Sequence, residues 1–62
     1  MIIFIDENDD NIRLDNYLSQ LFEDVSRSKI QNCIKNEKVL VNDVYKKPAY
    51  ILKAGDKIEF DS

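Results

Sequence analysis

The stretch that decides the fold is VSRSKIQNCIKNEKVLVN, residues 25–42. Apolar residues in its first half recur at helical spacing, which predicts a helix over about residues 27–36. Ser26 precedes this helix and is a favourable N-cap, because its hydroxyl can accept a hydrogen bond from an unpaired amide of the first turn. The apolar residues that follow predict a strand over residues 38–41.

The first turn of this helix carries two cations, Arg27 and Lys29. The helix dipole favours negative charge at this end, so the two cations oppose local stability. A helix N-terminus that also carries cations is suited to bind an anion such as phosphate. We therefore interpret this turn as a phosphate-facing surface, with ordinary solvated charge as the alternative.

The residues before this stretch predict a strand, a loop and a first helix. Residues 2–5 are apolar and β-branched, as in a strand, and residues 6–11 form an acidic loop. A helix is expected from Ile12 or Arg13 to Phe22, capped by Asp10 or Asn11. Its inward stripe should comprise Leu14, Tyr17, Leu18 and Leu21.

The residues after residue 41 predict further short extended segments. Asn42-Asp43 has the composition of a two-residue hairpin turn, with residues 44–45 as the returning strand. Extended structure resumes at residues 50–52, a turn follows around Gly55, and residues 57–60 alternate as a final strand. The predicted fold class is α+β, with two consecutive helices packed on a small, mostly antiparallel sheet.

Charge is distributed unevenly along the 62 residues, whose net charge is −3. Residues 1–24 carry seven acidic residues and one arginine, whereas residues 25–53 carry seven basic and two acidic residues. Local charge decides what a surface attracts, because salt screens charges over about 8–10 Å. The central segment is therefore a basic region between acidic ends.

The composition opposes catalysis by this chain alone. There is no histidine, and the single cysteine, Cys33, cannot form an intrachain disulfide or a thiolate zinc site. Cys33 is expected on the buried face of its helix, and the carboxylates are expected at solvated surface. We expect no cofactor, no metal site and no membrane span, and interpret the chain as a cytoplasmic monomer.

Four motifs together resemble the RNA-binding domain first described in ribosomal protein S4. They are R-L-D at residues 13–15, S-R-S-K-I at residues 26–30, V-L-V-N at residues 39–42 and G-D-K-I at residues 55–58. The series covers about residues 12–60 in the order and spacing typical of that family. The fold that the resemblance implies, two helices on a small sheet (the alpha-L RNA-binding motif), agrees with the elements predicted above.

The leader, residues 2–7, is similar to the N-terminus of large-subunit ribosomal RNA pseudouridine synthases, in which this domain precedes the catalytic domain. The resemblance implies that residues 1–62 are a single S4-like domain, the N-terminal fragment of a longer enzyme. Its implied role is to position structured ribosomal or transfer RNA. The implied RNA contacts come from Arg13, Ser26, Arg27, Lys29, Lys35, Lys38 and Asn42.

Two positions depart from the S4 family pattern. The family has glycine where Glu37 and Asp43 stand. At the end of the second helix, Asn36 can take the left-handed conformation instead of the glycine that is absent at position 37. The synthases carry a catalytic aspartate in an H-R-L-D-x-x-T-S-G motif. Asp15 lacks the preceding histidine and the following residues of that motif, so we do not assign it as catalytic.

Three alternatives remain open on the sequence. The chain can be a stand-alone S4-like protein of the ribosome or of translation quality control. Its helices can form a DNA-binding helix-turn-helix, although a strand follows the second helix at once. It can also be a protein-interaction module without a role in nucleic-acid binding.

Overall fold

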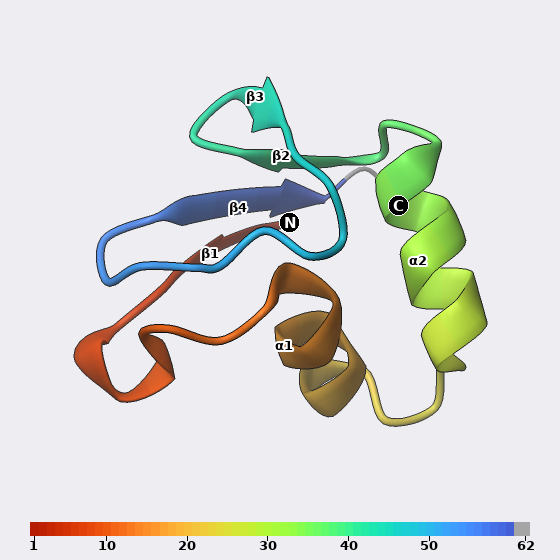
Figure 1. The fold of residues 1–62 in the computed structure, drawn as a ribbon, viewed down its shortest axis with the longest axis horizontal. Helices are drawn as coiled ribbons and strands as arrows, with labels where there is room; N and C mark the ends of the chain where they lie inside the picture. The colour runs from red at the N-terminus through yellow and green to blue at the C-terminus, as the bar shows by residue number, and fades with distance from the viewer. Residues whose placement is uncertain (61–62) are drawn as a thin grey trace.

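A four-stranded antiparallel sheet forms one layer of the computed structural model, which describes residues 1–60 (Figure 1). The strands are β1 (Ile2–Phe4), β2 (Val39–Val41), β3 (Val44–Tyr45) and β4 (Lys57–Phe60), in the order β1-β4-β2-β3. Two helices, α1 (Leu14–Leu21) and α2 (Arg27–Lys35), pack against this sheet, and a short 3₁₀ turn, η1 (Glu7–Asp9), follows β1. The predicted α+β class is confirmed.

The hairpin between β2 and β3 forms as the sequence predicts. Leu40 pairs with Tyr45 and Val41 with Val44, which leaves a two-residue turn. Both turn residues have positive φ, 53° at Asn42 and 67° at Asp43. These values suit a type I′ turn, whose twist matches that of the flanking strands.

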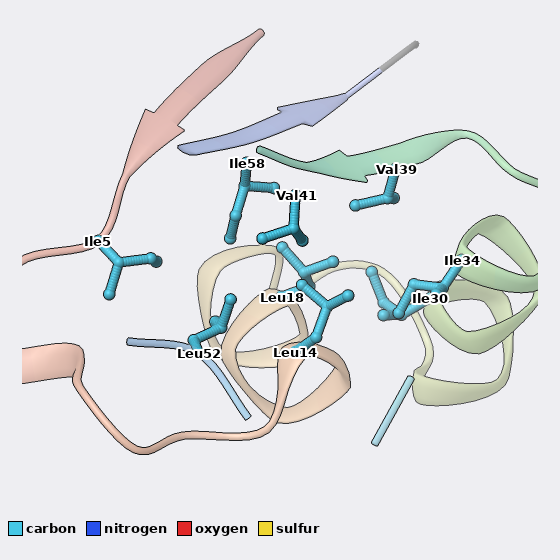
Figure 2. Packing of buried hydrophobic residues seen from close by; sticks show 9 residues of the cluster. All are labelled: Ile5, Leu14, Leu18, Ile30, Ile34, Val39, Val41, Leu52 and Ile58. Carbon is cyan, nitrogen blue, oxygen red and sulfur yellow. The ribbon is translucent and has the colours of Figure 1, made fainter. Parts of the chain in front are cut away.

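The core lies between the sheet and the two helices (Figure 2). Nine buried apolar side chains form it: Ile5, Leu14, Leu18, Ile30, Ile34, Val39, Val41, Leu52 and Ile58. Two side chains differ from the expected faces. Leu21, the last residue of α1, is 45% exposed, and Cys33 is only half-buried on α2.

The start of α1 differs from the prediction, because neither Asp10 nor Asn11 caps it. The helix begins at Leu14, whose amide donates to the carbonyl of Tyr50 at 2.8 Å, and the next amide donates to the carbonyl of Pro48 at 3.1 Å. Asp10 instead accepts from the amide of Ala54 at 2.9 Å. A distant segment thus satisfies the amides that a local cap would otherwise satisfy.

The end of α2 has the hydrogen bonds of a Schellman motif. The amide of Glu37 donates to the carbonyl of Ile34 at 3.2 Å, and that of Lys38 donates to the carbonyl of Cys33 at 3.1 Å. The left-handed residue is Glu37, with φ 60°, whereas Asn36 has φ −86°. The expectation that Asn36 takes the left-handed position is therefore wrong, because these bonds place the reversal one residue later.

Two further segments are less regular than predicted. Residues 50–52 contribute one isolated bridge, between Ile51 and Arg13, and no strand of the sheet. The acidic loop after β1 contains η1, capped by Asp6, whose carboxylate accepts from the amide of Asn8 at 2.8 Å. The turn before β4 has Gly55 at φ 92°, as expected for a residue without a Cβ.

Candidate nucleic-acid interface

The N-terminus of α2 is capped as predicted. The hydroxyl oxygen of Ser26 accepts from the amide of Lys29 at 3.2 Å. The first turn of α2 contains no acidic residue, and the side chains of Arg27, Ser28 and Lys29 are exposed. Amides of a first turn and cations together attract an anion, so this end of α2 has the chemistry of a phosphate-binding surface.

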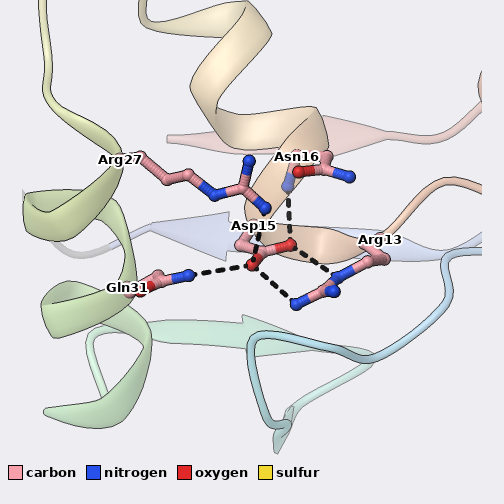
Figure 3. Close-up of polar contacts among 5 residues, drawn as sticks. All are labelled: Arg13, Asp15, Asn16, Arg27 and Gln31. Carbon is pink, nitrogen blue, oxygen red and sulfur yellow. Dashed lines mark hydrogen bonds and ion pairs between the residues drawn. The ribbon is translucent and has the colours of Figure 1, made fainter.

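Asp15 is a buried carboxylate to which donors from both helices converge (Figure 3). Arg13 donates to it twice, from Nε to Oδ1 at 3.1 Å and from Nη2 to Oδ2 at 3.0 Å. From α2, Gln31 donates to Oδ2 at 3.2 Å, and Nη2 of Arg27 lies 3.6 Å from the same oxygen. The amide of Asn16 donates to Oδ1 at 2.8 Å.

The burial of Asp15 contradicts the expectation that the carboxylates lie at solvated surface. Its exposed fraction is 0%. Burial raises the pKa of Asp15, but hydrogen bonds from Gln31 and Arg13, the charge of Arg13 and the amide of Asn16 outweigh it, so the net pKa is lowered. Asp15 is therefore ionised at neutral pH and carries the negative charge that the arginines face.

Arg13 and Arg27 come together at this carboxylate although 13 residues separate them in sequence. Their side chains remain 44% and 56% exposed. Gln31 lies on the same flank of α2 as Arg27, so that flank is partly used to hold α1 rather than left wholly to solvent. The face of α2 that carries Arg27 and Gln31 is consequently a contact between the helices as well as an exposed surface.

Lys35 and Lys38 are exposed near the C-terminal end of α2 and the start of β2. A lysine in the last turn of a helix is favourable, because the helix dipole is negative there. Glu37 stands between the two lysines and is also exposed. Its carboxylate reduces the positive potential of this end of α2.

Asn42 lies in the β2–β3 turn, at the end of β2 remote from α2 (Figure 1). Its side-chain nitrogen, Nδ2, donates to Oδ1 of Asp56 at 2.9 Å, and its side-chain oxygen accepts from the backbone amide of Lys57 at 3.0 Å. Tyr50 donates its hydroxyl to Oδ2 of the same carboxylate at 3.1 Å. The amide group of Asn42 therefore joins two turns, and the structure does not bring it near the other predicted RNA contacts.

Asp56 is the second buried acid that the sequence pattern did not reveal, with an exposed fraction of 9%. Burial raises its pKa, but hydrogen bonds from the amide of Lys53 and from Asn42 and Tyr50, with the charge of Lys53, outweigh burial and lower the net pKa. For the hydroxyl of Tyr50, burial and the adjacent Asp56 both raise the pKa. The Gly-Asp motif thus supplies a structural carboxylate.

The tertiary structure places two lysines of the basic segment, Lys46 and Lys47, near the start of α1. Lys46 and Lys47 precede the carbonyls of Pro48 and Tyr50, which receive the first amides of α1. The ammonium group of Lys46 lies 5.1 Å from the ring centroid of Tyr50. The loop that carries both lysines therefore lies beside the N-terminus of α1, and neither lysine is among the RNA contacts that the sequence predicts.

Within residues 1–60, no helix has the length and apolar character needed to cross a membrane. The same residues contain no group of three or more histidine, cysteine or carboxylate side chains arranged to hold a metal ion.

Comparison with known proteins places the chain in a family. The family model of the S4 domain matches residues 12–58. The chain is 42% identical over 57 residues to ribosomal large subunit pseudouridine synthase C of Buchnera aphidicola subsp. Schizaphis graminum, an alignment that covers 92% of the chain and 18% of the relative. It is 37% identical over 59 residues to ribosomal large subunit pseudouridine synthase D of Salmonella typhimurium, covering 94% of the chain and 18% of the relative.

The chain therefore spans less than a fifth of the length of these two synthases. The matched family region contains both helices, β2 and β3, and the turn that leads into β4. The helices and sheet are those that the sequence motifs imply. The chain belongs to the S4 domain family of RNA-binding domains.

Proposed function

We propose that this chain binds structured ribosomal RNA through its sugar–phosphate backbone and positions it for a pseudouridine synthase whose catalytic domain is not part of these 62 residues. The observation that supports this proposal most is that two half-exposed arginines, Arg13 just before α1 and Arg27 at the start of α2, lie beside the capped N-terminus of α2. The similarity to two ribosomal large subunit pseudouridine synthases supports the choice of RNA and of enzyme.

The proposed contacts are of two kinds. Arg13, Arg27 and the lysines 29, 35 and 38 meet phosphates, and the hydroxyl of Ser26 donates to a phosphate or sugar oxygen while its oxygen caps α2. Asn42 remains among the proposed contacts, through its exposed position at the β2–β3 turn. Phosphate contacts position an RNA without reading its sequence, so the target site is set by RNA shape and by the synthase.

Salt dependence tests RNA binding directly. With three to five phosphates neutralised, the logarithm of the association constant should fall with the logarithm of salt concentration at a slope of roughly −2 to −4. The measurement is a fluorescence-anisotropy titration of a structured RNA hairpin at several salt concentrations. A slope near zero would refute the proposal.

Matched lysine variants locate the surface. Lys29→Gln and Lys35→Gln should each make the salt slope shallower by roughly one, because each lysine neutralises one phosphate. Lys53→Gln removes the same charge from the turn before β4, on the opposite side of the molecule from α2 in Figure 1, and should leave the slope unchanged. Equal effects of all three variants would indicate non-specific attraction instead of this surface.

The synthase assignment has its own test. The gene that encodes this chain should continue into a sequence that encodes H-R-L-D-x-x-T-S-G, the motif that carries the catalytic aspartate of the synthases. A gene that ends after Ser62 would exclude a catalytic domain in the same chain. It would leave RNA binding by the S4 domain to be judged by the titrations.

A further inference from the structure

We propose that Asp15 is a positioning residue that joins Arg13 and Arg27 into one clamp for a phosphodiester group. The inference rests on the proposed RNA binding and adds to it a role for a buried acid that cannot itself touch RNA. The ligand chemistry is a phosphodiester, because guanidinium groups bind phosphate oxygens through paired, charge-assisted hydrogen bonds.

The contacts of Asp15 limit the positions of both arginines. Arg13 is bound through two nitrogens, Nε and Nη2, so its guanidinium plane is set by the carboxylate (Figure 3). Nη2 of Arg27 approaches Oδ2, the same oxygen that Nη2 of Arg13 contacts. The two nitrogens lie 3.0 Å and 3.6 Å from this oxygen. The two guanidinium groups are therefore close enough for one phosphodiester group to bridge them.

The carboxylate itself is fixed independently of the arginines. The amide of Asn16 binds Oδ1 and the side chain of Gln31 binds Oδ2, and Asp15 has no exposed surface. A carboxylate held in this way cannot rotate to follow a mobile arginine. The arginines are thus arranged by the packing of α1 against α2.

Charge explains why an acid improves a site for an anion. Two guanidinium groups this close repel each other, and one carboxylate between them offsets that repulsion. The acid is buried, whereas Arg13 and Arg27 are half-exposed, so an approaching phosphate meets cations first. Within residues 1–60, no hydrogen bond occupies Nη1 of Arg13, or Nε or Nη1 of Arg27, and these groups remain to bind phosphate.

The variant Asp15→Asn distinguishes a positioning role from a general charge effect, because the two predict opposite changes in RNA affinity. It removes one negative charge, so general electrostatics predicts tighter RNA binding. Loss of the clamp predicts binding weaker by roughly 3- to 10-fold, because two flexible side chains must then be ordered by the RNA itself. The matched control Asp43→Asn removes an exposed acid that contacts Lys57 and should bind RNA equally or slightly more tightly.

The outcomes are distinct. Wild-type protein that shows no salt-dependent binding to the RNA hairpin refutes the proposed function, and the clamp with it. Wild-type binding with weaker binding by folded Asp15→Asn supports the clamp. Binding by folded Asp15→Asn that equals or exceeds that of the wild type overturns the clamp and leaves RNA binding intact.

Side-chain NMR of the wild-type protein decides the matter if Asp15→Asn does not fold. The clamp requires the Nε–H signal of Arg13 to stay protected from solvent exchange, in the free protein and in the complex with the hairpin. The remaining guanidinium signals of Arg13 and Arg27 should shift together as RNA is added. Loss of the Arg13–Asp15 hydrogen bonds in the complex would overturn the clamp, because the arginine would then leave Asp15 to bind RNA.

Discussion

Replacing Glu37 by glycine should stabilise the protein. Glu37 is the left-handed residue of the Schellman motif that ends α2, with φ 60°. The left-handed conformation costs a residue with a Cβ roughly 1–2 kcal/mol, and glycine avoids that cost. Glycine also gives the unfolded chain more freedom, which reduces the gain by roughly 0.5–1 kcal/mol.

The net expectation for Glu37→Gly is a free energy of unfolding that rises by about 0.5–1 kcal/mol. For a domain of this size, that corresponds to an increase in Tm of roughly 2–8 °C. Urea and thermal denaturation followed by far-UV circular dichroism measure both quantities. The urea m-value should not change, because the surface exposed on unfolding stays the same.

Asn36→Gly is the matched control, because it makes the same substitution one residue earlier. Asn36 has φ −86°, so glycine gains nothing there and should lower the free energy of unfolding by about 0.5–1 kcal/mol. If Asn36→Gly stabilised the protein and Glu37→Gly did not, the helix would reverse at residue 36 and our account of its end would be wrong. RNA affinity should not fall in Glu37→Gly, since the variant loses an acid beside two lysines.

Three further predictions concern the polar contacts that hold the domain. The folded protein should lose stability as pH falls below about 4, because the pKa values of Asp15 and Asp56 are lowered from 3.8 and the unfolded chain binds protons first; a urea midpoint that does not change between pH 6 and pH 2.5 would contradict this. Ser26→Ala should lower the free energy of unfolding by about 1 kcal/mol, because it removes the oxygen that caps the amide of Lys29. Ser26→Asp keeps an oxygen at this position and should retain most of the wild-type stability. Asn42→Gly keeps the turn but deletes the amide group, and calorimetry should show a loss of about 1–3 kcal/mol as Asp56 loses a buried donor; an unchanged Tm would show that this contact adds nothing.

Local patterns were sufficient where a feature depends on neighbouring residues. Helical spacing and the Ser26 cap located α2, and the Asn-Asp dipeptide located the hairpin turn. Each of these features satisfies its hydrogen bonds within a few residues of itself. The motif series then identified the S4 domain, whose family model matches residues 12–58.

Features that depend on distant contacts were missed. The N-terminus of α1 is satisfied by carbonyls of residues 48 and 50, so the nearby cap residues were free for other bonds. The sequence predicts that Asp56 lies in a turn. In the structure its carboxylate is also buried and accepts hydrogen bonds from Asn42 and Tyr50. Such pairings lie outside any local window of sequence.

The sequence by itself determined the fold class, the two helices, the hairpin and the basic character of the central segment, because apolar periodicity, capping and turn chemistry act locally. Only the tertiary structure decided which cations lie close together. Arg13 immediately precedes α1 and Arg27 begins α2, and they meet because core packing brings the two helices side by side and buries Asp15 between them. A buried carboxylate must be paired, and that requirement explains why two arginines distant in sequence lie beside Asp15.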